Sequence, residues 1–165
     1  MVHNEQPDKR VSPDGEHHKL EYQERIDNYI PFAEKVFEEY CEKKGKKYKQ
    51  LHLNDRSDFE NSPIPNWYRM SPLLKSFPDY FVYNDTMQFL VEVKSSNRVK
   101  VKDLMHYCTL NTLYSEGRPT KYAIAFCFKK GEVKLLTIDE LMLLIPKAKL
   151  GYYEDNRMDY YEFTW

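Results

Sequence analysis

The segment between Pro78 and Lys94 constrains the fold more than any other part of the chain. Two runs of strand-forming residues, 78–83 and 87–94, flank the turn residues 84–86, a pattern typical of a β-hairpin. Strand alternation puts Phe89, Val91 and Val93 on one face of the second strand, and Gln88, Leu90, Glu92 and Lys94 on the other. Glu92 and Lys94 are therefore expected to be neighbours on one face of a sheet.

The position of the turn decides which residue of the first strand lies opposite Glu92. A two-residue turn at Asp85-Thr86 pairs position 79 directly with position 92 and brings their Cβ atoms to about 5 Å. A turn at Asn84-Asp85 slips the register, so that Asp79 becomes a diagonal neighbour of Glu92 at roughly 7 Å. Either distance allows Asp79 and Glu92 to share one cation.

Asp79, Glu92 and Lys94 together predict a particular chemistry. Two carboxylates so close on a sheet repel each other at neutral pH, and a divalent cation removes that repulsion. Mg²⁺ prefers oxygen ligands and is often held by one or two carboxylates, with water and a substrate phosphate completing its shell. Lys94 adds a positive charge beside that phosphate or water. The combination favours phosphodiester hydrolysis.

The chain of 165 residues has the size of one globular domain. Apolar spacings of three and four predict a helix over 18–44, where Pro31 either kinks the helix or begins a second one. Helices are also predicted from residue 101 to near Gly117 and over 139–145, the last capped by Thr137 or Asp139. Strands are predicted over 47–53, 122–128 and 132–138. This order indicates an α/β fold with a mixed sheet flanked by helices.

Three segments have a different character from this core. Residues 1–17 predict a flexible N-terminal arm, because they offer turns and little to bury. Residues 54–71 predict a long loop, and 151–165 an acidic, tyrosine-rich C-terminal tail. Residues 18–150 are therefore expected to form the single domain. The tail either docks on its own domain, binds a protein partner or stacks on bases.

The sequence Pro78-Asp79, followed by Glu92-Val93-Lys94 on the next strand, resembles the core motif of the PD-(D/E)XK nuclease superfamily. That family's restriction-endonuclease-like core runs helix, three strands, helix, strand (α-β-β-β-α-β), and the predicted order agrees. The resemblance implies a Mg²⁺- or Mn²⁺-dependent endonuclease, for which DNA is expected as the substrate rather than RNA, with catalytic Asp79, Glu92 and Lys94. It points to the archaeal-type Holliday junction resolvases and the phage repair nucleases, and so to repair or recombination.

Glu34 is a further acidic candidate. Ala33-Glu34-Lys35 on the first helix resembles the Ala-Glu-Arg segment of the resolvase branch, which implies that Glu34 joins Asp79 and Glu92 as a metal ligand and catalytic residue. The alternative is a glutamate on a solvated helix face. The chain also departs from the family, since the helix after the core carries His106 and Asn111 in place of the common glutamine motif.

Nucleic-acid contacts are expected from local groups of residues, because a net charge of −1 provides no general attraction. The residues expected to contact phosphate are Lys46, Lys47, Ser95, Arg98, Lys100 and Lys102. The lysines from Lys43 to Lys49 have an alternative interpretation as a solvated helix end. The residues from Ser95 to Arg98, directly after the motif, have an alternative interpretation as an ordinary turn.

Three isolated cysteines, Cys41, Cys108 and Cys127, are expected to be reduced. The absence of an apolar leader or spanning run disfavours secretion and membrane insertion, so a cytoplasmic (intracellular) location is expected. Homodimerisation is expected by analogy alone. Two rivals to the enzyme stay open: a nuclease-fold module that binds nucleic acid or protein without cutting, and an interaction factor that acts through the tail.

Overall fold

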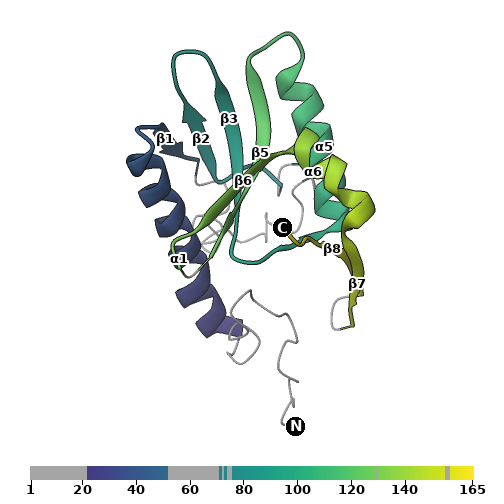
Figure 1. Ribbon diagram of the computed structural model, residues 1–165. Helices are drawn as coiled ribbons and strands as arrows, with labels where there is room; N and C mark the ends of the chain where they lie inside the picture. The colour runs from purple at the N-terminus through teal and green to yellow at the C-terminus, as the bar shows by residue number, and fades with distance from the viewer. Residues whose placement is uncertain (1–21, 52–70, 72, 74–75, 129, 155–156) are drawn as a thin grey trace, which may run out of the picture.

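The structure is a computed structural model that describes residues 22–51, 71, 73, 76–128, 130–154 and 157–165. A five-stranded sheet lies between two long helices, and a three-stranded sheet adjoins it (Figure 1). The predicted arm, 1–17, lies outside the described residues, as does the predicted loop 54–71 apart from Ser71. Within the described part, no helix is both long enough and apolar enough to cross a membrane.

The larger sheet has the strand order β1-β2-β3-β5-β6. Its strands are β1 (Lys47–Gln50), β2 (Tyr80–Tyr83), β3 (Gln88–Lys94), β5 (Thr120–Cys127) and β6 (Val133–Thr137). β3 and β5 are parallel and are connected through α5 (Val101–Ser115), as a parallel pair requires, while the other neighbours are antiparallel. The predicted α/β class and mixed sheet are confirmed, and the predicted strands agree to within a few residues.

Helices cover both faces of this sheet (Figure 1). On one face, α1 (Tyr22–Lys43) packs Ala33, Val36 and Phe37 against a layer that includes Val91, Ala123 and Ala125. On the other face, α5 packs Leu104, Tyr107 and Leu110 against a layer that includes Leu90, Tyr122 and Ile124. Burial on both faces explains why β5 reads as a continuous apolar run rather than an alternating one.

Local sequence signals explain where the helices begin and end. α1 continues through Pro31 as one helix, so no second helix starts there. It stops before Gly45, whose φ of 60° lies in the left-handed region that glycine adopts without strain. α6 (Ile138–Leu144) is capped by Thr137 rather than Asp139, because the Glu140 amide donates to Thr137 Oγ1 and the Thr137 amide donates to the Glu140 carboxylate. The 3-10 helix η2 (Ile145–Lys147) follows.

The predicted C-terminal tail is largely folded into a second sheet. β4 (Arg98–Lys100), β8 (Met158–Glu162) and β7 (Lys149–Tyr153) pair antiparallel in the order β4-β8-β7. Asn97 is tied to Phe163 by two hydrogen bonds, from its amide side chain to the Phe163 carbonyl (2.8 Å) and from the Phe163 amide to its carbonyl (3.0 Å). Trp165 packs on Phe126 of the large sheet, with ring centroids 4.8 Å apart. The tail therefore docks on its own domain, one of the outcomes that the sequence left open.

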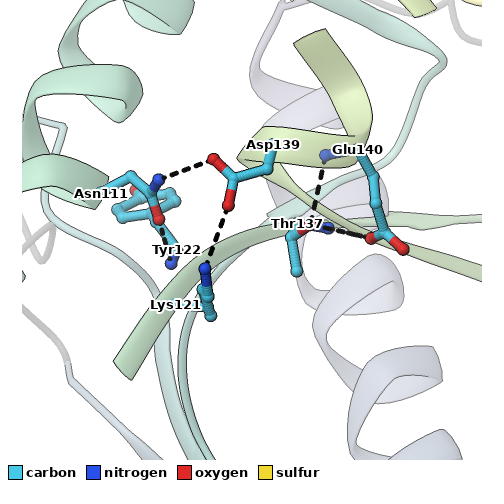
Figure 2. Close-up of polar contacts among 6 residues, drawn as sticks. All are labelled: Asn111, Lys121, Tyr122, Thr137, Asp139 and Glu140. Carbon is cyan, nitrogen blue, oxygen red and sulfur yellow. Dashed lines mark hydrogen bonds and ion pairs between the residues drawn. The ribbon is translucent and has the colours of Figure 1, made fainter. Parts of the chain in front are cut away.

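Asn111 connects α5 to the start of β5 at the point where β6 stops pairing with it (Figure 2). The β5–β6 pairing ends at Ala123 opposite Thr137, so β6 offers no partner to the amide of the preceding residue. The buried Asn111 accepts that amide of Tyr122 at 2.9 Å and donates to Asp139 at 3.3 Å. Lys121 binds the other oxygen of Asp139 at 3.1 Å. One side chain thus joins α5, β5 and α6.

Asn111→Ala is expected to lower the free energy of unfolding by about 1–3 kcal/mol, because the Tyr122 amide loses its partner in a buried place. Urea unfolding followed by far-UV circular dichroism measures the change. Thr109→Ala is the control, since Thr109 is exposed on the same helix and its hydroxyl bonds only to a helix carbonyl. Equal losses in the two variants would contradict the role given to Asn111.

Candidate metal centre

The hairpin of β2 and β3 has the first of the two registers predicted. Tyr80 pairs with Val91 and Tyr83 with Gln88. The Asn84 amide donates to the Met87 carbonyl at 3.0 Å, so Asp85 and Thr86 form a two-residue turn. The Asn84 side chain accepts the amides of Thr86 (3.0 Å) and Met87 (2.7 Å), which holds that turn. One position beyond the Tyr80–Val91 pair, Asp79 comes opposite Glu92.

Asp79 is fixed from both neighbouring strands. Its carbonyl accepts the amide of Leu51, directly after β1, at 2.8 Å. Its carboxylate accepts the amide of Val93 in β3 at 2.7 Å. Burial, the charge of Glu92 and the weaker influence of Glu34 raise the pKa of Asp79 from 3.8 to about 8, against the lowering effects of the Val93 hydrogen bond and of Lys94. Asp79 therefore holds a proton at neutral pH unless a cation replaces it.

Glu92 lies in the interior of the sheet with one oxygen satisfied and the other not. Its side chain is buried, and Oε1 accepts the Lys94 ammonium at 2.6 Å and the Tyr107 hydroxyl at 3.1 Å. Oε2 is buried and has no hydrogen-bond partner, and it is the only such side-chain atom in the described part of the chain. A buried carboxylate oxygen without a partner is costly, and it marks a place where a cation or an ordered water is expected.

Lys94 supplies a fixed positive charge to the same pair of strands. Its ammonium group lies 5.6 Å from the centre of the Tyr107 ring. Burial lowers the pKa of Lys94, but attraction to Glu92, Tyr107 and Asp103 outweighs burial and raises that pKa well above its ordinary value. Lys94 therefore stays charged across the physiological range.

Glu34 flanks this group and does not join it. Gln50, at the end of β1, donates to the Glu34 carboxylate at 3.2 Å, and the charge of Glu34 acts on Asp79 only as a minor influence on its pKa. Among the described residues, no three His, Cys, Asp or Glu side chains gather closely enough to hold a metal by themselves. The structure brings Asp79, Glu92 and Lys94 together and leaves Glu34 beside them.

The residues predicted to contact phosphate divide into two groups. Ser95 directly follows β3, and Lys100 and Lys102 lie at the start of α5, close to the first-turn Asp103 whose charge acts on Lys94. Lys46 and Lys47 lie at the other end of the sheet, since Lys47 pairs with Tyr83, four residues or about 13 Å of strand from Asp79. Lys46 lies over the Phe89 ring instead, at 5.9 Å.

Arg98 needs a correction, because the structure commits it to the second sheet. Its guanidinium binds the Glu162 carboxylate through two nitrogens at 2.8 Å each, across the β4–β8 pair. The guanidinium also lies 4.6 Å from the centre of the Tyr160 ring. Its side chain is mostly buried, so its charge is paired with Glu162 within the second sheet and is not directed to a phosphate.

Tyr107 is the site residue that the sequence analysis did not single out. It lies on α5, the helix that follows the motif, where an aromatic side chain more often has a structural role. Its ring stacks on Tyr122 at 5.2 Å, and its hydroxyl reaches Glu92. Burial and the charge of Glu92 raise the pKa of Tyr107 well above its ordinary value, so it remains a neutral donor. The spacing Leu104, Tyr107, Leu110 was the available signal, because it puts Tyr107 on the helix face that packs on the sheet.

Comparison with known proteins adds no family to this geometry: neither a scan against protein-family models nor a search of curated proteins found a match to the chain. The residues themselves fit a hard divalent cation. Two carboxylates at opposed strand positions offer oxygen ligands, one of those oxygens has no other partner, and Mg²⁺ commonly takes only one or two carboxylates from a protein. The remaining positions in its shell would be filled by water and substrate.

Asp79→Asn is expected to stabilise the metal-free protein above neutral pH. In the wild type, folded Asp79 keeps its proton up to about pH 8, while the unfolded side chain loses it near pH 4, so the Asp79 contribution to the free energy of unfolding falls as pH rises between these values. An asparagine does not titrate and removes that fall. Thermal melts in chelator from pH 5 to 8.5 measure the difference, with Tm expected to rise about 2–4 °C for each kcal/mol regained.

Asp85→Asn is the matched control, because Asp85 is exposed in the hairpin turn. It is expected to leave the pH dependence of Tm unchanged. Mn²⁺ added above pH 8 is expected to raise the Tm of the wild type and of Asp85→Asn but not that of Asp79→Asn. A pH dependence of Tm that is the same in Asp79→Asn and the wild type would contradict the raised pKa of Asp79.

Proposed function

We propose that this protein is a metal-dependent nuclease of the PD-(D/E)XK kind, which hydrolyses phosphodiester bonds in DNA. The observation that carries the proposal is the buried, unpartnered Oε2 of Glu92 on a strand position opposed to Asp79. A purely structural ion pair between Glu92 and Lys94 would favour satisfying both carboxylate oxygens, and here the pair satisfies one.

Asp79 strengthens the proposal because its proton can be exchanged for a cation. A carboxyl group with a pKa of about 8 ionises readily only when a positive charge arrives beside it. Mg²⁺ or Mn²⁺ held by Asp79 and Glu92 would lower the pKa of a bound water and neutralise charge that builds on the phosphate. Glu34 is proposed as an outer acid that adds to the negative field at Asp79 and does not contact the metal directly.

Lys94 and Tyr107 complete the proposed machinery. Lys94 stays protonated and donates to a substrate phosphate oxygen or to the attacking water. Tyr107 donates to Glu92 Oε1 and not to Oε2, so it would hold the carboxylate without occupying the oxygen proposed to bind the cation. The two side chains bind the same oxygen of Glu92, which leaves the other for the metal.

The arrangement of the elements supports the family assignment. α1, the strands β1 to β3, α5 and β5 follow one another in the order of the restriction-endonuclease-like core, with the short β4 inserted before α5. The acidic residues lie on the β2–β3 hairpin, which is where the motif of that family places them. Ser95, Lys100 and Lys102 are the proposed phosphate contacts near this end of β3.

A second candidate is a nuclease-fold module that binds nucleic acid or a protein without cutting. The observation that favours it is the 2.6 Å contact between Lys94 and Glu92, which satisfies part of the site with no cation present. In such a module Lys94 would neutralise Glu92 permanently, and Asp79 would stay protonated.

Asp79→Ala, Glu92→Gln and Lys94→Met are each expected to lower the rate of DNA cleavage by about a hundredfold or more, as losing a group that stabilises developing charge does. The measurement is single-turnover cleavage of labelled linear, branched and single-stranded DNA and RNA, with Mn²⁺ and with chelator. Removing the metal is expected to abolish cleavage.

Two exposed residues give matched controls, Asp85→Asn for the acids and Lys130→Met for the lysine, and both are expected to cleave like the wild type. If the purified wild type binds these probes but cuts none of them in Mn²⁺, the enzyme is contradicted and the second candidate, a module that binds without cutting, is supported. Cleavage that survives in Asp79→Ala or in chelator would mean that another site, or a contaminant, does the cutting.

A further inference from the structure

Ser76 and His106 form a hydrogen-bonded pair that the proposed mechanism leaves unused. Ser76 Oγ lies 2.9 Å from His106 Nδ1, and Ser76 is buried. His106 belongs to α5 and is partly exposed. A buried residue thus fixes the orientation of a partly exposed ring.

The pair lies next to the candidate metal centre and is tied to it from two directions. Ser76 precedes Asp79 by three residues, so their Cα atoms are at most about 10 Å apart. The carbonyl of Ser76 accepts the Tyr122 hydroxyl at 3.0 Å, and the Tyr122 ring stacks on Tyr107, which binds Glu92. His106 is also the helix neighbour of Tyr107.

The Ser76 contact occupies Nδ1 of His106 and leaves Nε2 as the ring nitrogen that can meet a ligand. Nε2 carries a proton when the serine hydroxyl donates to Nδ1 of a neutral imidazole or accepts from Nδ1–H of an imidazolium, and lacks one only in the neutral tautomer whose Nδ1–H donates to Ser76. In the described part of the chain, His106 makes no other hydrogen bond, and Nε2 is not among the buried unpartnered atoms. Nε2 is therefore available to a group that comes from outside the protein, and it donates to that group in the tautomer in which Ser76 donates to Nδ1.

We propose that His106 is a substrate-backbone contact, whose Nε2–H donates to a non-bridging oxygen of a phosphate next to the one being cleaved. The inference rests on the proposed function for its ligand, because a nucleic-acid strand with one phosphate at Asp79 and Glu92 presents its next phosphate close by. Ser76 is the positioning residue, and His106 holds the strand without taking part in bond breaking.

The test compares His106→Ala, His106→Gln and Ser76→Ala with the wild type. Binding of short fluorescein-labelled duplex and single-stranded DNA is measured by anisotropy in Ca²⁺, and kcat and KM are measured in Mn²⁺. His106→Ala is expected to weaken Kd and raise KM about three- to tenfold, as loss of one hydrogen bond does, with kcat within about twofold. His106→Gln is expected to recover at least half of the lost affinity through its amide N–H. The affinity of Ser76→Ala is expected to fall between those of His106→Ala and His106→Gln.

The outcomes separate this inference from the proposed function. Cleavage by the wild type with unchanged Kd and KM in His106→Ala would overturn the contact and leave the nuclease standing. Weaker binding in His106→Ala, with no cleavage by any form, would support the contact and overturn the nuclease. If glutamine recovers nothing, or if Tm falls in step with affinity, or if no DNA binds, the contact is overturned.

Discussion

The register of the β2–β3 hairpin is the constraint on which the rest of the site depends. Two turn residues, Asp85 and Thr86, held by the Asn84 side chain, set Tyr80 opposite Val91. Because strand side chains alternate, the same register directs Val91 to α1 and brings Asp79 opposite Glu92. A slip by one residue would have turned Tyr80 and Val82 away from α1 and Asp79 away from the face of Glu92, so packing and the site are fixed by the same pairing.

This register creates an electrostatic conflict that the protein resolves only in part. Asp79 avoids repulsion by keeping its proton, and Glu92 is neutralised by Lys94 on one oxygen while its other oxygen stays buried and unpartnered. Tyr107 adds a hydrogen bond to the oxygen that is already paired. A cation beside Glu92 Oε2 would resolve the remaining part of this conflict, which is the physical reason for proposing a metal and, from the charge of Lys94, a phosphodiester.

The sequence predicted what depends on local pattern and missed what depends on distant partners. The alternation in 88–94 gave the correct faces, and turn residues limited the register to two choices. β4, β7 and β8 were not predicted, because their pairing joins residue 98 to 162 and residue 149 to 162, and no local periodicity reports such contacts. For the same reason Arg98 was expected to contact phosphate although Glu162 binds it, and the contact of Tyr107 with Glu92 was not predicted.

The most direct measurement is anomalous diffraction from crystals grown with Mn²⁺ above pH 8, where Asp79 can give up its proton. We expect a Mn²⁺ peak bonded to Glu92 Oε2 and to the Asp79 carboxylate, at roughly the 2.0–2.2 Å typical of small divalent ions with oxygen ligands. Lys94 is expected to stay bound to Glu92 Oε1. A map with no peak there, or with Mn²⁺ bound only elsewhere, would contradict the claim that these two strands form a cation site.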